Sequence, residues 1–238
     1  MAAKSNLKSF LHANKTTKSR EFLLTSRVIH DLMVAAAARN YDLLVYTPTV
    51  DSDGFDLILD DRDRYLPLQL KSVTGKKREW DIHRKLLRPE RHEVEWFGFE
   101  SSACGTGRGG GVLLLEVSSQ ECTVDVKYLY TDIHVLTAFW LDLISITTNT
   151  KKRLFKLREE LESTPGGIVY VPKSAFLQAR TPEHLLALAG LHSRYRNSWQ
   201  DLLVQLAQYK YEKRQLNAPE KTIRNLIQKD LKALVIHK

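Results

Sequence analysis

The chain has 238 residues, of which 43% are hydrophobic and 27% charged, and its formal net charge is +8 at neutral pH. A chain of this size buries roughly 70% of its unfolded surface and needs no disulfide bonds to support a core, and its two cysteines, Cys104 and Cys122, exclude a disulfide framework and a cysteine metal site. No stretch has the apolar length of a secretory signal or a membrane span, so we expect a cytoplasmic protein with no membrane partner.

The two ends of the chain are basic. Residues 1–20 contain five basic side chains and no acidic one, and residues 151–238 contain 17 Lys and Arg against 8 Asp and Glu. Residues 21–150 therefore carry a net charge of −6. An acidic centre between basic ends suits a nucleic-acid enzyme, although an unremarkable basic protein has the same balance. We expect residues 1–18 to form a basic flexible arm, in which residues 7–12 are compatible with a short helical turn, that either contacts phosphate groups or only adds solubility.

A helix is predicted from Ser19, whose hydroxyl suits the N-cap position. Val28, Leu32 and Ala35 fall on one stripe of this helix, and that stripe is expected to face the core. Glu21 lies seven residues before Val28, which places it at the start of the same inward stripe. Its carboxylate either stabilises the positive end of the helix or reaches a functional site.

Residues 51–74 are the most informative part of the sequence. They predict two strands around the polar turn 60–64, because apolar and polar residues alternate on both sides of that turn. Asp56, Gln69 and Lys71 fall on faces that lack the leucines. These polar faces belong either to the solvated outside of a hairpin or to a metal site.

The polar residues of the hairpin offer hard oxygen ligands. The carboxylate of Asp56, the amide oxygen of Gln69 and the backbone carbonyl of Leu70 suit Mg²⁺, with Mn²⁺ as the alternative ion. The ammonium group of Lys71 is then placed to hold a water molecule or a phosphate oxygen beside that ion.

This arrangement resembles the PD-(D/E)XK nuclease superfamily. Asp56, twelve intervening residues and then Gln69-Leu70-Lys71-Ser72 are similar to the branch whose last motif reads Gln-x-Lys. The segment Asp53-Gly54-Phe55-Asp56 fits the motif that surrounds the aspartate in that branch, and Glu21 stands where family members carry a helix glutamate. The resemblance covers roughly residues 19–117.

The resemblance implies a restriction-endonuclease-like core and an Mg²⁺-dependent endonuclease. Glu21, Asp56, Gln69 and Lys71 would be catalytic, and Glu21, Asp56, Gln69 and Leu70 would bind the metal. Gln69 replaces the anionic residue of the commoner motif, which should weaken metal binding. Related families mostly cut DNA in restriction, repair or defence, so DNA is the expected nucleic acid. Many act as dimers, which leaves a homodimer or a partner protein open.

Basic residues follow Lys71 closely and are interleaved with Trp80. Such a run is usually a solvated surface, but its position next to Lys71 favours contact with the nucleic-acid backbone. The side chains expected to bind nucleic acid are Lys76, Lys77, Arg78, Arg84, Lys85 and Arg88. His83 lies in the same run, and no catalytic role is expected for it.

The remaining segments predict a mixed sheet with helices around it, followed by helices only. Strands are expected at 41–46, 111–117, 122–130 and 168–171, and helices at 135–146, at 151–162 and after Thr181. Gly105, Gly107 and Gly110 match a dinucleotide-binding pattern, but a strand follows them and no dinucleotide cofactor is expected. The fold class is therefore α/β (α+β), with a central mixed β-sheet flanked by helices. We divide the chain into the arm 1–18, a nuclease-like domain 19–175 and a helical C-terminal region 176–238.

Three functions follow from these observations. The first is a metal-dependent nuclease. The second is a nuclease-fold DNA-binding subunit with weak or no activity that serves a partner enzyme. The third is a protein-interaction domain whose basic ends meet an acidic partner.

Overall fold

The computed structural model describes residues 6–49, 54–73, 77–100, 107–120, 123–163, 167–191 and 198–236. The helices are α1 (Asn6–His12), α2 (Thr17–Ala37), α4 (Ile133–Trp140), α5 (Thr148–Ser163), α6 (Pro182–Leu188), α7 (Ser198–Glu212) and α8 (Glu220–Leu234), with the 3-10 turns η1 (Asn14–Thr16), η2 (Arg84–Leu87) and η3 (Lys173–Ala175). The strands are β1 (Leu44–Tyr46), β2 (Leu57–Asp60), β3 (Tyr65–Ser72), β4 (Glu79–His83), β5 (Gly111–Gln120), β6 (Thr123–Asp132), β7 (Ile168–Pro172) and β8 (Leu177–Gln178).

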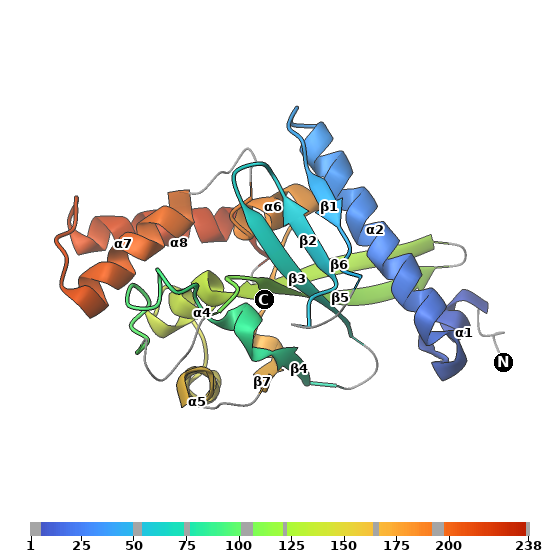
Figure 1. Ribbon diagram of the computed structural model, residues 1–238, viewed down its shortest axis with the longest axis horizontal. Helices are drawn as coiled ribbons and strands as arrows, with labels where there is room; N and C mark the ends of the chain where they lie inside the picture. Colours follow the sequence, from blue (N-terminus) through green and yellow to red (C-terminus); the bar gives the residue numbers. More distant parts are fainter. Residues whose placement is uncertain are drawn as a thin grey trace.

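Six strands form one mixed sheet in the order β1-β2-β3-β5-β6-β8. Strands β3 and β5 run parallel, and the other neighbours are antiparallel. Strands β4 and β7 form a separate antiparallel pair. Helix α2 lies beside β1 and β2, and α7 and α8 lie together at the opposite end of the molecule (Figure 1). The predicted fold class, a mixed β-sheet flanked by helices, is confirmed.

The predicted hairpin is confirmed, with β2 paired to β3 around residues 61–64. Alternate residues of a strand point to the same face of the sheet, and the leucines of one face are buried here: Leu57, Leu59, Leu66 and Leu68. One face of the hairpin is therefore buried in the core, and its polar residues lie on the other face.

The N-terminal segment contains the short helix expected near residues 7–12, but its described part is packed rather than an extended arm. From Asn6 onward it is helical, and Leu11 is buried. Helix α2 begins at Thr17 rather than after Ser19, because η1 leads directly into it. The hydroxyl of Thr16 donates to the carbonyls of Phe10 and Ala13, at 2.5 and 2.8 Å, and so fixes the turn between α1 and α2.

The C-terminal region is helical from Thr181, as predicted. Thr181 caps α6 by accepting the backbone N–H of His184, and Pro182 occupies the first turn. Residues 176–238 also contribute β8 to the six-stranded sheet, which the sequence did not predict. Buried side chains such as Trp199 and Ile223 belong to the same continuous core as the sheet. No helix within the described ranges has the length and apolar character needed to cross a bilayer.

Candidate active site

Asp56 lies directly against the backbone of the Gln-Leu-Lys segment. The register pairs Leu57 with Leu68, so continuing it by one residue places Asp56 opposite Gln69. The Asp56 N–H donates to the carbonyl of Leu68 at 2.8 Å. Its carboxylate Oδ2 accepts the N–H of Leu70 at 2.6 Å. The aspartate is exposed.

Gln69 connects the hairpin to the second sheet. Its side chain is buried, and its Oε1 accepts the backbone N–H of His83 at 3.2 Å. Gly54 lies in the same contact, because a Cβ on Gly54 would come within 2.6 Å of His83 Cβ and 3.4 Å of Gln69 Nε2. The amide is therefore held at the junction of β3 and β4.

Gly54 is expected to tolerate no side chain. Its φ of +76° disfavours an L residue, and the added Cβ would collide with His83. Gly54→Ala should lower the free energy of unfolding by about 1–3 kcal/mol, measured by urea denaturation. Gly167→Ala is the matched control, since its Cβ would meet only His83 Nε2, at 3.6 Å. Equal effects of the two substitutions would contradict this reading.

Asp81 adds a second carboxylate that the sequence did not single out. The hydrogen bond from Lys77, at 3.0 Å from Nζ to Oδ1, lowers the pKa of Asp81, and the charge of Lys71 lowers it further. Lys71 and Asp81 are thus within electrostatic reach of each other. The sequence feature that could have identified Asp81 is its position between Trp80 and Ile82, which are both buried along β4.

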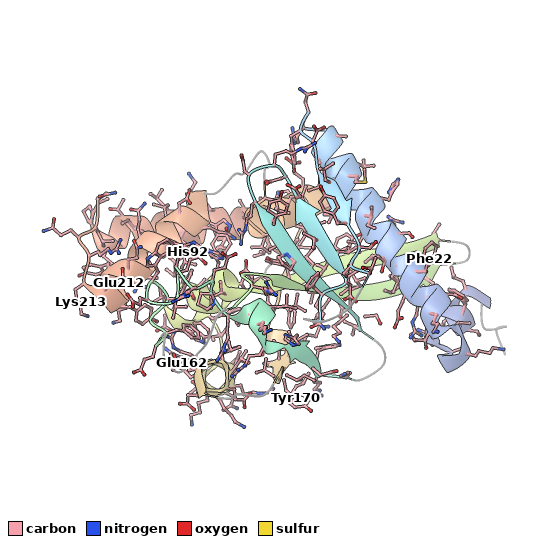
Figure 2. The ribbon with its side chains drawn as sticks, viewed as in Figure 1. Phe22, His92, Glu162, Tyr170, Glu212 and Lys213 are labelled. Carbon is pink, nitrogen blue, oxygen red and sulfur yellow. The ribbon has the colours of Figure 1, made fainter. Side chains whose placement is uncertain are left out.

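The outer face of the second sheet borders this group of residues. In the β4–β7 register Asp81 pairs with Tyr170 and His83 pairs with Ile168. Directly paired residues of an antiparallel sheet share a face. Tyr170 is 65% exposed, and Figure 2 shows its side chain at the outer edge of β7. An exposed aromatic ring therefore lies on the same face as Asp81.

Glu21 is exposed, which corrects the expectation that it reaches an inward-facing site. The buried line of α2 is Leu24, Val28, Leu32 and Ala36. At 100° per residue Glu21 falls within about 20° of Val28 on the helix, so its exposure reflects its place near the start of α2 and not the face on which it lies. Glu21 is exposed and makes no hydrogen bond or ion pair with another described residue.

The basic run after Lys71 divides into buried and exposed side chains. Arg84 and Arg88 are buried, at 8% and 3% exposure, so the expectation that they form a phosphate-binding surface is wrong. Arg88 Nε donates to the carbonyl of Leu161 at 2.6 Å, near the end of α5, where backbone carbonyls lack helical partners. Trp80 is also buried and packs edge-on against Phe176.

Three of the predicted nucleic-acid contacts remain at the surface. Lys77, Arg78 and Lys85 are exposed. Lys76 lies outside the described residues, as do Asp51 and Asp53.

Arg88 is expected to contribute to stability. Arg88→Ala removes the donor to the Leu161 carbonyl and should lower the free energy of unfolding by about 1–3 kcal/mol. Arg78→Ala, which changes an exposed arginine of the same run, should leave it within about 0.5 kcal/mol. Thermal or urea unfolding of the two variants measures the difference. If Arg88→Ala has the same free energy of unfolding as the wild type, Arg88 does not stabilise the fold.

The donor set fits Mg²⁺ in chemistry. Within the described ranges no cluster of three or more His, Cys, Asp or Glu side chains is arranged to hold a metal. Mg²⁺ is usually bound through one or two carboxylates together with water and substrate phosphates. Asp56 supplies a carboxylate and Gln69 an amide oxygen, and Asp81 is a further carboxylate within electrostatic reach of Lys71. This set is compatible with such an open site and not with a closed all-protein one.

Comparison of the chain with protein-family models, with curated proteins and with solved structures found no match. The candidate site therefore stands on its own geometry.

Proposed function

We propose that the chain is a metal-dependent nuclease that hydrolyses phosphodiester bonds in nucleic acid. One observation carries the proposal: the Asp56 carboxylate lies 2.6 Å from the backbone N–H of Leu70, between Gln69 and Lys71. Gln69 and Lys71 are two residues apart on β3 and share a face. An acid, an amide and a lysine are thus assembled at the open end of one hairpin.

The chain order supports a restriction-endonuclease-like core. Helix α2 precedes the three antiparallel strands β1, β2 and β3, and β5 then pairs parallel to β3. This succession of an N-terminal helix, the aspartate strand and the Gln-x-Lys strand is the order that the PD-(D/E)XK resemblance implies. We therefore retain that superfamily as the proposed relationship.

The proposed roles follow from the chemistry of each group. Asp56, Gln69 and the carbonyl of Leu70 would hold Mg²⁺ or Mn²⁺, which when bound would polarise a phosphodiester oxygen. Lys71 would orient the attacking water and offset the negative charge that develops on the phosphate. Glu21 is exposed and has no part in this proposal; Asp81 replaces it as the second carboxylate.

The substrate we propose is DNA, held through its phosphates by exposed cations. Lys77, Arg78 and Lys85 lie on or beside β4, next to the hairpin. Such contacts depend strongly on salt. They position a strand at the site without reading its sequence.

A second candidate function is a DNA-binding subunit with little or no activity. The observation that favours it is the hydrogen bond between Gln69 Oε1 and the His83 N–H, which ties the neutral amide to β4. Together with the exposed Glu21, this leaves fewer anionic ligands than the commoner motif has. This alternative predicts DNA binding that falls with salt and no cleavage with any divalent ion.

Cleavage assays separate the two candidates. Purified protein is incubated with plasmid and with single-stranded DNA in Mg²⁺, Mn²⁺ or EDTA, beside Asp56→Ala. We expect cleavage with Mg²⁺ or Mn²⁺, none with EDTA, and none by the variant. Cleavage by Asp56→Ala at the wild-type rate would refute the site, and binding without cleavage would favour the second candidate.

Tyr170 is expected to stack on a base that has left the duplex. Its ring is exposed beside Asp81, and stacking of a base on an aromatic side chain contributes about 1–3 kcal/mol. Tyr170→Ala should therefore weaken binding of single-stranded DNA by roughly tenfold or more, measured by fluorescence anisotropy. Tyr170→Phe keeps the ring and should bind as the wild type does. Equal losses in both variants would contradict stacking.

A further inference from the structure

A cavity of about 650 Å³ lies at the turn end of the hairpin, between that turn and the start of α7. Asp56, Gln69 and Lys71 are at the open end of the hairpin and do not line it. The protein as a whole is basic, with a net charge of +8, but this cavity is bordered by carboxylates. They are Asp61, Asp63, Glu90, Glu93 and Asp201.

The arginine that lines the cavity is already engaged. Arg64 Nη1 donates to the carbonyl of Ala189 and to Gln200 Oε1, each at 3.1 Å. Gln200 is buried and donates in turn to the carbonyl of Leu188 at 3.1 Å. The guanidinium is therefore held in the wall by neutral acceptors. By formal charge, the carboxylates outnumber the one arginine among the residues that line the cavity.

His134 presents a buried polar group to the same cavity. It is 6% exposed, and its ring packs edge-on between Phe97 and Trp199, with centroid distances of 5.3 and 6.4 Å. Its Nδ1 lies 3.5 Å from Oδ2 of Asp132. Asp132 is thus the partner of Nδ1, whereas Nε2 makes no hydrogen bond with a residue that the structure describes. With Nδ1 turned to Asp132, Nε2 is the nitrogen left for a ligand.

Asp132 is itself fixed, so it holds the ring of His134 in place. Its Oδ1 accepts the N–H of Val135 at 2.8 Å, and its Oδ2 accepts the hydroxyl of Tyr130 at 3.0 Å. A carboxylate beside Nδ1 favours the tautomer with its proton on that nitrogen. The lone pair of Nε2 is then an acceptor for an N–H donor.

An aromatic ring completes the recognition elements. Trp96 lines the cavity, is half-buried, and meets His92 edge-on at a centroid distance of 5.6 Å. The face of an indole ring attracts organic cations.

We propose that this cavity binds an organic cation that carries N–H donors, namely a guanidinium or primary ammonium group. The carboxylates neutralise its charge, Trp96 covers its face, and Nε2 of His134 accepts one of its N–H groups. The cation comes either from a free small molecule or from an Arg or Lys side chain of a protein. The proposal is independent of any nuclease activity.

The test is calorimetric titration of the full chain at low salt. The two probes are agmatine, which carries both groups, and a blocked pentapeptide with a central arginine. The neutral comparison is n-butylurea. Glu93→Gln combined with Asp201→Asn removes two rim charges without touching the core. Glu95→Gln changes an exposed neighbour that does not line the cavity.

We expect saturable binding of at least one cationic probe, weakened about tenfold or more by the double variant and unchanged by Glu95→Gln. A tighter agmatine complex assigns the site to a free cation, and a tighter peptide complex assigns it to a protein side chain. Absence of saturable binding up to roughly 10 mM would overturn the proposal. So would equal binding of n-butylurea, or binding that the double variant leaves intact.

Discussion

Asp132→Ala is expected to lower the free energy of unfolding by about 3–5 kcal/mol. Asp132 is fully buried and caps the first turn of α4 through the N–H of Val135. The substitution also removes the acceptor of the Tyr130 hydroxyl and the charge that faces His134. These groups would stay buried without their partner, which is the costly outcome for a polar cluster in a core.

Urea denaturation of the purified variant measures this effect. Asp132→Asn is the matched control, because its amide oxygen still accepts the Val135 N–H while the charge is lost. We expect it to cost about 1–2 kcal/mol, less than the alanine variant. An alanine variant within about 1 kcal/mol of the wild type would show that the cluster contributes little.

The same carboxylate predicts the direction of a pH effect. Burial raises the pKa of Asp132, but the nearby His134, the Val135 N–H and the charge of Arg64 outweigh burial and hold the pKa below its usual range. The stabilisation is therefore complete above the pKa of an unfolded aspartate, about 3.9, and is lost as the pH falls through the lower folded value. The wild type should lose more stability on acidification than Asp132→Asn does.

Lys71→Ala is expected to lower the rate of Mg²⁺-dependent cleavage by about 10²–10³-fold while the fold remains intact. Removal of one group that stabilises developing negative charge has an effect of this size. Lys71 is half-buried at the end of β3, so its truncation should change the free energy of unfolding little. Single-turnover cleavage gives the rate, and urea denaturation gives the stability.

Lys127→Ala is the matched control, since Lys127 is an exposed lysine on β6 of the same sheet. Its cleavage rate should equal that of the wild type. If Lys71→Ala cleaves as fast as Lys127→Ala, Lys71 has no catalytic role and the assignment of the Gln-x-Lys motif is wrong.

The hairpin was predictable because its signals are local. The alternation of leucines with polar residues fixes which face is buried, and the charged turn fixes where the chain reverses. Asp56, Gln69 and Lys71 could therefore be placed near one another from sequence alone. Thr181 and Pro182 mark the start of the C-terminal helices in the same local way.

The surroundings of the hairpin were not predictable, because they depend on contacts between distant segments. Arg88 resembles a surface cation in sequence, but its partner is a carbonyl at Leu161. Asp81 lies on β4, which the hydrogen bond between the His83 N–H and Gln69 Oε1 joins to β3. Glu21 falls on the inward stripe by its spacing, but it lies near the start of α2, where the side chain is exposed.

His83 contributes through its backbone rather than its ring. Sequence reasoning considered the imidazole and assigned it no catalytic role, whereas the structure uses the N–H of His83 to hold Gln69. Backbone contacts of this kind leave no residue-type signal. The same holds for the Leu70 N–H that binds Asp56.

Calorimetric titration with Mn²⁺ tests the central claim most directly, because it measures the ion that the open end of the hairpin is proposed to hold. The comparison is between wild type, Asp56→Ala, and Asp142→Ala, in which an exposed aspartate paired with Lys151 is removed instead. The account predicts one Mn²⁺ site in the wild type and in Asp142→Ala, and its loss in Asp56→Ala. Equal Mn²⁺ binding by Asp56→Ala and the wild type would contradict it.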